Sequence, residues 1–306
     1  MPPDSLTLRA PAKINLSLRV TGRRPDGYHT LDTLMQKVAL YDRLVLRPKK
    51  RGIRLSCPDS DLPEDDSNLV HRAAAHFLSS MGHRLSGTAQ GVELVLFKTI
   101  PVAAGLGGGS SDAAATLLGM NRIFQAGCSR RELAEMGLAL GADVPFFVSD
   151  LAAARATGIG EVLVPAPSLE GYLVLLANPG FSVSTRWVYE TFALTSETKK
   201  INLSNSLDDE RRSKQGGPSS GRYDYHFEMT NDLERVTISR HPGISEIKQA
   251  LLAGGAEAAM MSGSGPTVFA LFPLQQLERA RKCQHTLRAS CPHVFLVEPL
   301  RSERGG

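Results

Sequence analysis

A glycine-rich segment in the first half of the chain constrains the fold and the chemistry more than any other feature. Residues 101–115 read PVAAGLGGGSSDAAA, so four glycines occupy five positions and two serines follow. Glycines let backbone N–H groups converge because no Cβ atoms intervene. The alanine-rich continuation predicts a helix over 110–124, whose first N–H groups are unpaired and carry the positive dipole end. Loop and helix start together predict a polyphosphate cradle, with Ser110 and Ser111 able to reach a phosphate or its Mg²⁺.

The alternative for this segment is a tight turn whose serines only cap the helix, but the glycine density exceeds what a turn needs. Three better-known motifs are excluded. No Gly-Lys-Ser/Thr follows the glycines, so the segment is not a Walker loop. Ser110 stands where the dinucleotide fingerprint has Gly or Ala, and no alternating parallel-sheet pattern surrounds it. His-Arg-Asp and Asp-Phe-Gly are absent, which excludes the protein-kinase set.

Composition limits the class of protein and its partners. The 306 residues are 42% hydrophobic and 22% charged, which predicts an ordinary globular protein of one large domain or two smaller ones. The charge of 35 − 31 = +4 is small, and no basic run is interleaved with aromatics, so we expect no nucleic-acid partner. No long apolar run or secretory signal is present, so we expect a cytoplasmic protein without a membrane partner. We expect reduced thiols at Cys57, Cys128, Cys283 and Cys291.

Hydrophobic periodicity predicts a different arrangement of elements in each half of the chain. In the first half we expect strands over 5–20, 31–47 (interrupted near Asp42) and 91–99, and helices over 67–78 (capped at Asp66 or Ser67), 110–124 and 129–141 (opened by a Ser129 capping box). In the second half we expect a strand over 171–177, a mobile polar insertion over 194–222, a helix over 245–253, strands over 258–261 and 267–272, a helix over 274–288 and a strand over 293–297. Such split βαβ repeats predict an α+β domain of ferredoxin-like type.

Four shorter motifs carry further polar groups, each with a plain structural alternative. Lys13 and Asn15 share one face of the first strand, because side chains alternate, and that face could simply be wet. The turn 26–29 (DGYH) ends in an aromatic pair, of which the histidine could be an ordinary surface residue. Asp143 stands among apolar residues in GADVPFF, where it could be a catalytic base or a helix cap. The second glycine loop, 261–266, could be a plain hairpin.

These five motifs, in this order, resemble those of the GHMP kinase superfamily. That superfamily combines an N-terminal strand motif, a central Pro-x-x-x-Gly-Leu-Gly-Ser/Gly-Ser-Ser loop and a C-terminal glycine loop. The resemblance spans the chain from Ala10 to about Leu300. It implies an α+β, two-domain GHMP kinase fold, with an N-terminal βαβ nucleotide-binding domain that binds ATP over 1–160. A C-terminal ferredoxin-like substrate domain would follow over 161–306, with the polar insertion near 194–222.

Details of the motifs narrow the resemblance. PAKINL at 11–16, RPDGYH at 24–29, GLGGGSSDAA at 105–114 and GADVPFF at 141–147 look like members that act on a cytidine-diphosphate-linked methylerythritol. The implied reaction is transfer of the γ-phosphoryl of ATP to the tertiary 2-hydroxyl, in the mevalonate-independent isoprenoid route. Homoserine, mevalonate and sugar kinases would lack the DGYH turn. A nucleotide-binding regulator would have lost Lys13 and Asp143, and a basic RNA-binding module would carry more charge.

The resemblance also implies roles by position. Asp143 would be the general base, and Lys13 would keep it ionised and stabilise charge on the transferring phosphoryl group. The implied ATP-binding residues are Asn68 (adenine), Lys98 (edge of the triphosphate), Pro101, Gly105, Leu106, Gly107, Gly108, Gly109, Ser110 and Ser111. The implied substrate-binding residues are Asn15 (orientation), Tyr28 and His29 (cytidine), Thr185 (a hydroxyl contact) and Tyr189 (stacking on the base).

ATP and Mg²⁺ are the implied cofactors. The metal would be held through the ATP phosphates and by the Ser110 hydroxyl, without a dedicated set of protein ligands. Asp112 stands where some relatives carry Asn and receives no role; its charge beside bound phosphates would be unfavourable unless it faces Mg²⁺ or a lysine. We expect small-molecule substrates as the partners and a monomer or weak homodimer.

Overall fold

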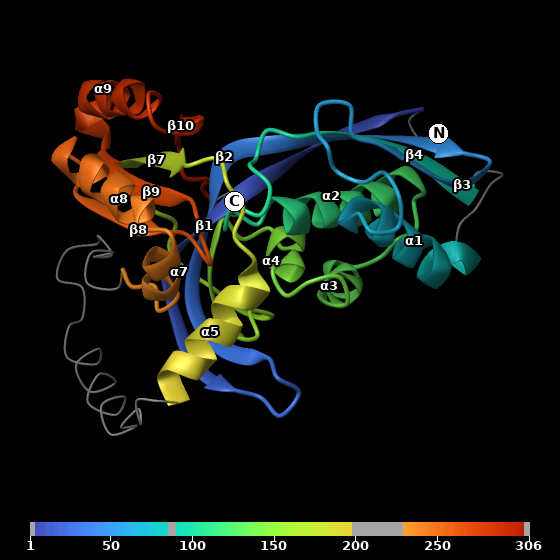
Figure 1. Ribbon diagram of the computed structural model, residues 1–306. Helices are drawn as coiled ribbons and strands as arrows, with labels where there is room; N and C mark the ends of the chain where they lie inside the picture. The colour runs from blue at the N-terminus through green and yellow to red at the C-terminus, as the bar shows by residue number, and fades with distance from the viewer. Residues whose placement is uncertain (1–3, 85–89, 198–228, 303–306) are drawn as a thin grey trace.

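Two β-sheets form the framework of the molecule. The computed structural model describes residues 4–84, 90–197 and 229–302. Within them, helices α1 to α4 lie beneath the first sheet, and helices α8 and α9 cover one face of the second (Figure 1). The α+β class predicted from the sequence is therefore confirmed.

The first sheet contains six strands among the described residues. They are β1 (Leu6–Arg23), β2 (His29–Lys49), β3 (Arg51–Ser56), β4 (Gln90–Phe97), β5 (Ala153–Gly158) and β6 (Val162–Pro165). The order is β3-β4-β2-β5-β6, and β1 pairs along β2. β3 and β4 are parallel and are joined through α1 (Leu69–Met81), which is the expected βαβ unit. The expected break near Asp42 is a register shift and not an end of the strand: β2 continues, but its pairing with β1 skips from Val38 to Tyr41. The buried Asp42 carboxylate accepts the backbone N–H groups of Thr99 and Ile100.

The helices of the first half differ from expectation mainly at their starts. α1 is capped by Asn68, not by Asp66 or Ser67, because the Asn68 Oδ1 accepts the Val70 N–H at 2.9 Å. α2 (Gly108–Ile123) begins at Gly108, since Gly107 takes a left-handed conformation and serves as its N-cap. α3 (Arg130–Leu138) has the predicted capping box but ends before Gly141. The short helix α4 (Val144–Val148) follows Asp143 directly.

The second sheet has the predicted ferredoxin-like topology. Its strands are β7 (Tyr172–Asn178), β8 (Ala258–Met261), β9 (Val268–Pro273) and β10 (His293–Val297), and its helices are α5 (Thr185–Glu197), α7 (Glu234–Arg240), α8 (Gly243–Ala253) and α9 (Leu277–Leu287). The strand order β10-β7-β9-β8 is antiparallel throughout. The predicted polar insertion overlaps the end of α5 at residues 194–197, and its remaining residues, 198–222, lie outside the described part.

The two sheets share a buried interface. Leu173 and Leu175 of β7 pack towards α8 and α9, whereas Val174 and Leu176 pack against Ile14 and other apolar residues of the first sheet. This alternation explains why β7 is continuously apolar from Leu173 to Ala177. The interface brings β1, the glycine loop and α5 around one space. No described helix combines the length and the hydropathy that a bilayer span requires.

Candidate active site

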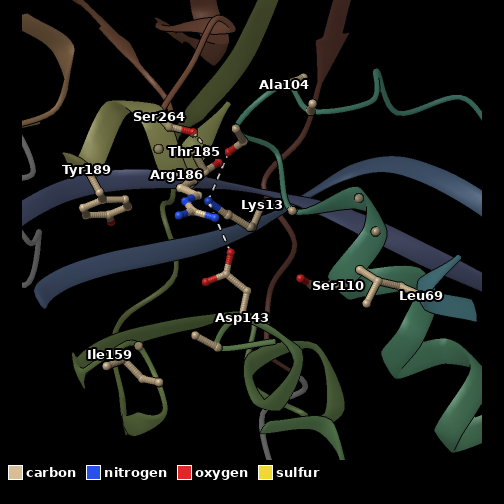
Figure 2. A pocket seen from close by; sticks show the side chains of 18 of the residues that line it. Lys13, Leu69, Ala104, Ser110, Asp143, Ile159, Thr185, Arg186, Tyr189 and Ser264 are labelled. Atoms are coloured by element: carbon tan, nitrogen blue, oxygen red, sulfur yellow. Dashed lines mark hydrogen bonds and ion pairs between the residues drawn. The ribbon is translucent and has the colours of Figure 1, made fainter. Parts of the chain in front are cut away.

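An elongated cavity of about 1410 Å³ lies where β1, the glycine loop and α5 meet. The glycine loop and the start of α1 form one side of it, and α5 forms the other (Figure 2). Residues 26–29 of the β1–β2 turn also line the cavity. Of the site residues predicted from the sequence, those that line it are Lys13, Asn15, Tyr28, His29, Asn68, Lys98, Pro101, Gly105, Gly107, Gly108, Gly109, Ser110, Asp143, Thr185 and Tyr189. Leu106 and Ser111 are buried beneath the loop and are not among the lining residues.

The glycine loop offers unpaired donors to this cavity. The first helical hydrogen bond of α2 runs from the Ser111 N–H to the Gly107 oxygen at 2.9 Å. The N–H groups of Gly108, Gly109 and Ser110 therefore have no acceptor among the described residues. The Ser110 hydroxyl also makes no hydrogen bond within the described chain. Three N–H groups, a free hydroxyl and a helix N-terminus constitute an anion site.

Gly105 is required where the two glycine loops meet. Its φ of 77° is left-handed, and a Cβ built on it would lie 2.0 Å from the Ser262 oxygen. The Ser262 hydroxyl, in turn, donates to the Gly105 oxygen at 2.9 Å and accepts the Asn15 N–H at 3.3 Å. The segment 261–266 does join β8 to β9, but it also holds the first glycine loop in place. The sequence singled out this loop without assigning Ser262 a role.

Lys13 and Asp143 face each other at the centre of the cavity. The Lys13 Nζ lies 3.8 Å from the Asp143 Oδ2, and it donates to the Asn15 Oδ1 at 2.6 Å and to the Gly105 oxygen at 3.0 Å (Figure 2). Burial lowers the pKa of Lys13, and Asp143 opposes this effect. Although Asp143 precedes α4, its side chain makes no capping hydrogen bond within the described chain. Asp143 therefore stands at the N-cap position of α4 without a side-chain capping bond, and its carboxylate stays available to the cavity.

Behind Lys13, a buried chain of hydrogen bonds fixes Asn15. The Asn15 Nδ2 donates to the Thr33 Oγ1 at 2.8 Å, and Thr33 donates to the Ser17 oxygen at 2.6 Å. The alternative that this strand face is simply wet is wrong, because Lys13 and Asn15 are both buried. Thr33 was missed, because only the pairing of β1 with β2 brings it beside Asn15.

Lys98 is held by two buried carboxylates. It forms an ion pair with Asp42 and lies 2.8 Å from the Asp112 Oδ2. Burial raises the pKa of Asp112 to about 7, and Lys98 works in the opposite direction. Asp112 thus faces a lysine, which accounts for the charge that the sequence left without a role. A Cβ added at Gly108 would lie 3.3 Å from the Lys98 Nζ, so the ammonium lies directly beneath the glycine loop.

Asn68 uses both ends of its amide within the protein. Its Nδ2 donates to the Pro63 oxygen at 2.7 Å, and its Oδ1 caps α1. Leu62 and Leu69 line the cavity beside it and offer apolar surface suited to a flat base. The contact between Asn68 and adenine stays a prediction.

The other end of the cavity is aromatic. The rings of His29 and Tyr189 stack at 5.3 Å, and the Phe192 ring meets His29 edge-on at 6.4 Å. Burial lowers the pKa of His29, and the positive charge of Arg23 lowers it further. Burial raises the pKa of Tyr189, and the negative charge of Asp143 raises it further. Tyr28 remains 61% exposed on the turn. The predicted cytidine residues thus come together, but two of them contact each other directly.

Two family models match the chain. Residues 68–150 match the GHMP kinases N terminal domain, and residues 221–293 match the GHMP kinases C terminal domain. Together with the βαβ unit, the glycine loop and the ferredoxin-like sheet, these matches define an ATP-dependent kinase of the GHMP class that acts on small molecules.

Individual relatives narrow the class. A 4-diphosphocytidyl-2-C-methyl-D-erythritol kinase from Desulfotalea psychrophila is 47% identical over 87% of this chain and 85% of its own length. A crystal structure of 4-(cytidine 5′-diphospho)-2C-methyl-D-erythritol kinase has a TM-score of 0.74 and 34% identity, and covers 98% of this chain and 100% of that one. A homoserine kinase from Cytophaga hutchinsonii shares the fold, with a TM-score of 0.69 and 22% identity over 98% of this chain and 96% of its own. The chain belongs to the family of 4-diphosphocytidyl-2-C-methyl-D-erythritol kinases.

Proposed function

We propose that the chain transfers the γ-phosphoryl group of ATP to the 2-hydroxyl of 4-diphosphocytidyl-2-C-methyl-D-erythritol. The product is the 2-phosphate, an intermediate of the mevalonate-independent route to isoprenoid precursors. The observation that carries the proposal is the Asp143 carboxylate, which has no capping bond and lies 3.8 Å from the Lys13 ammonium, in a cavity lined by a phosphate loop. The names of relatives that cover most of the chain support this choice of acceptor.

In this mechanism Asp143 acts as the general base. Its carboxylate accepts the proton of the 2-hydroxyl while the alcohol oxygen bonds to the γ-phosphorus. The bond from that phosphorus to the β–γ bridging oxygen breaks, and ADP leaves with the electron pair. Lys13 keeps Asp143 ionised and stabilises the charge that spreads over the phosphoryl oxygens. A tertiary alcohol is crowded, so alignment contributes more than the strength of the base.

The glycine loop would hold the triphosphate. The unpaired N–H groups of Gly108, Gly109 and Ser110 would donate hydrogen bonds to the phosphate oxygens, and no flexible side chain has to be ordered for this. Lys98 adds a positive charge beneath the loop, where Asp42 and Asp112 fix it. The apolar surface beside Asn68 would take the adenine.

Mg²⁺ fits this arrangement as a companion of ATP. No group of three or more His, Cys, Asp or Glu side chains that could hold a metal ion is found among the described residues. The Ser110 hydroxyl lines the cavity and is free to act as a ligand, while the phosphates supply most of the oxygens, as Mg²⁺ commonly requires. When bound, the ion would neutralise charge on the β- and γ-phosphates.

The acceptor would lie across the rest of the cavity. Tyr28 and His29 would hold the cytidine, Tyr189 would stack on the base, and Thr185 would contact the methylerythritol diphosphate part. Asn15, fixed by Thr33, would orient the hydroxyl beside Asp143. Because His29 and Tyr189 stack on each other, a base bound between them requires one ring to move aside.

The organisation of the chain supports a simple division of labour. Residues 1–160 would bind ATP, and residues 161–306 would complete the acceptor site, in a cytoplasmic monomer or weak homodimer without a nucleic-acid partner. The small net charge supports the absence of a nucleic-acid partner.

A coupled assay of ADP release tests the function. We expect turnover with the cytidyl-methylerythritol substrate and none above background with homoserine or mevalonate. The product should carry phosphate on the 2-position, which phosphorus NMR measures. Equal turnover with homoserine would overturn the proposed acceptor while leaving the kinase class intact.

A further inference from the structure

The proposed acceptor carries a diphosphate between its cytidine and its reacting alcohol, and the following inference rests on that proposed function. If the base lies by Tyr189 and the alcohol by Asp143, the diphosphate crosses the space between them. Two phosphates in a partly enclosed cavity need a positive partner. Among the described residues, the lysines and arginines that line the cavity are Lys13, Arg23, Lys98 and Arg186.

Both lysines are already engaged. Lys13 is buried and binds Asn15, Gly105 and Asp143, and Lys98 is buried between Asp42 and Asp112 beneath the ATP end. Arg23 lies at the far end of the β1–β2 hairpin, where it is paired in register with His29. Its position is therefore at the cytidine and not between the base and the alcohol.

Arg186 lies in the intervening space. It stands on α5 three residues before Tyr189, so both side chains project from the same side of the helix. The preceding residue, Thr185, hydrogen-bonds to Ser264 at 2.9 Å and so ties the start of α5 to the second glycine loop. Figure 2 shows the Arg186 guanidinium between Tyr189 and Asp143, on the cavity side of α5.

The present partner of Arg186 is easily displaced. Its Nε donates to the Glu190 Oε1 at 2.8 Å, and its side chain is 87% exposed. Exposed i,i+4 pairs contribute little to stability, so exchanging Glu190 for a diphosphate has a small cost. The Nη1 and Nη2 atoms have no acceptor among the described residues, which leaves a planar pair of donors for phosphate oxygens.

We propose that Arg186 binds the diphosphate of the cytidyl substrate and is a specificity-determining residue for a phosphate-bearing acceptor. It leaves Glu190 on binding and bridges the base site to the reaction centre. Neither the sequence motifs nor the family resemblance assigned this residue a role.

Calorimetric titration with cytidine and with cytidine 5′-diphosphate isolates the phosphate contribution without any turnover. We expect the wild-type chain to bind the diphosphate more tightly than the nucleoside by about tenfold or more, as a charge-assisted pair predicts. Arg186→Met should remove most of this preference and leave cytidine affinity unchanged. The same variant should raise the KM for the cytidyl substrate by about tenfold and leave the KM for ATP unchanged.

Arg131→Met is the matched control. Arg131 forms an i,i+4 pair with Glu135 through its Nε at 2.9 Å and is 89% exposed, but it lies on α3 and does not line the cavity. This variant should keep both the diphosphate preference and the two KM values.

The outcomes distinguish failure of the Arg186 role from failure of the proposed function. If Arg186→Met keeps the wild-type preference for the diphosphate, or if Arg131→Met loses it equally, the role of Arg186 is overturned while the proposed function stands. If the wild-type chain binds neither cytidine nor its diphosphate, the proposed acceptor itself is overturned.

Discussion

The two ends of the cavity differ in how firmly their side chains are held. At the end formed by the glycine loop, Lys98 is 7% exposed and Asp42 is fully buried, and each is fixed by several hydrogen bonds or ion pairs. At the end formed by the β1–β2 turn and α5, Tyr28 is 61% exposed, and Arg186 has one weak partner. The end where we propose that ATP binds is therefore preorganised, whereas the proposed acceptor end would be ordered by its ligand. This difference predicts that buried substitutions change stability or catalysis and exposed ones change acceptor affinity alone.

Asp143→Asn gives the largest expected effect. The amide cannot accept the proton, so turnover should fall by about 10²–10⁴-fold. ATP affinity should stay close to wild type. The free energy of unfolding should fall by at most about 1 kcal/mol, because the change removes a 3.8 Å pair between Lys13 and a partly exposed carboxylate and no capping bond is lost in the described chain. Steady-state kinetics, thermal unfolding and titration with a non-hydrolysable ATP analogue measure the three quantities. Turnover within a few-fold of wild type would refute the role of Asp143 as base.

Gly105→Ala tests the contact between the two glycine loops. The added Cβ would clash with the Ser262 oxygen, and the alanine would have to adopt the left-handed φ of Gly105. We therefore expect a loss of about 3 kcal/mol in the free energy of unfolding. Gly52→Ala is the control, because Gly52 has a φ of 75° and open space around it. It should lose only about 1 kcal/mol. Urea unfolding distinguishes the two, and equal losses would show that the loops do not need this close approach.

Asp42→Asn tests the ion pair beneath the phosphate loop. Its remaining oxygen can still accept the Thr99 and Ile100 N–H groups, so the change removes mainly the charge that faces Lys98. We expect a loss of about 2 kcal/mol in the free energy of unfolding and weaker ATP binding. Asp32→Asn, on the same strand, breaks an ion pair with Arg155 at the surface and should cost at most about 1 kcal/mol. Unchanged ATP affinity in Asp42→Asn would show that Lys98 does not depend on Asp42.

Tyr28→Ala and His29→Ala give the smallest expected effects. Each should raise the KM for the cytidyl substrate by about five- to tenfold through lost contact with the base, and leave the KM for ATP and the stability nearly unchanged. Initial rates with each substrate varied in turn provide the values. Equal increases in the two KM values would place these residues outside the cytidine site. The two ends of the cavity would then not differ in their effect on acceptor affinity.

Local patterns predicted most elements correctly but missed features that depend on pairing between distant segments. The capping box at Ser129 was found, because both partners lie within four residues. The continuity of β2 through Asp42 was not, since the carboxylate is satisfied by N–H groups more than fifty residues away. The cap at Asn68 was misplaced by one or two residues, because Ser67 and Asp66 carry the same type of capping group.

The sequence by itself determined the glycine-rich loop and the ferredoxin-like order of strands, because glycine density and periodicity are local properties. The candidate base and lysine came from the family resemblance, which depends on the order of the motifs along the whole chain. Only the tertiary structure decided that Asp143 lacks a capping bond, that Asp112 and Asp42 share Lys98, and that Arg186 faces the cavity. Such facts depend on which side chains meet when two sheets pack together. Burial then sets the strength of each electrostatic interaction and the pKa of each group, and the spacing of residues along a chain does not specify burial.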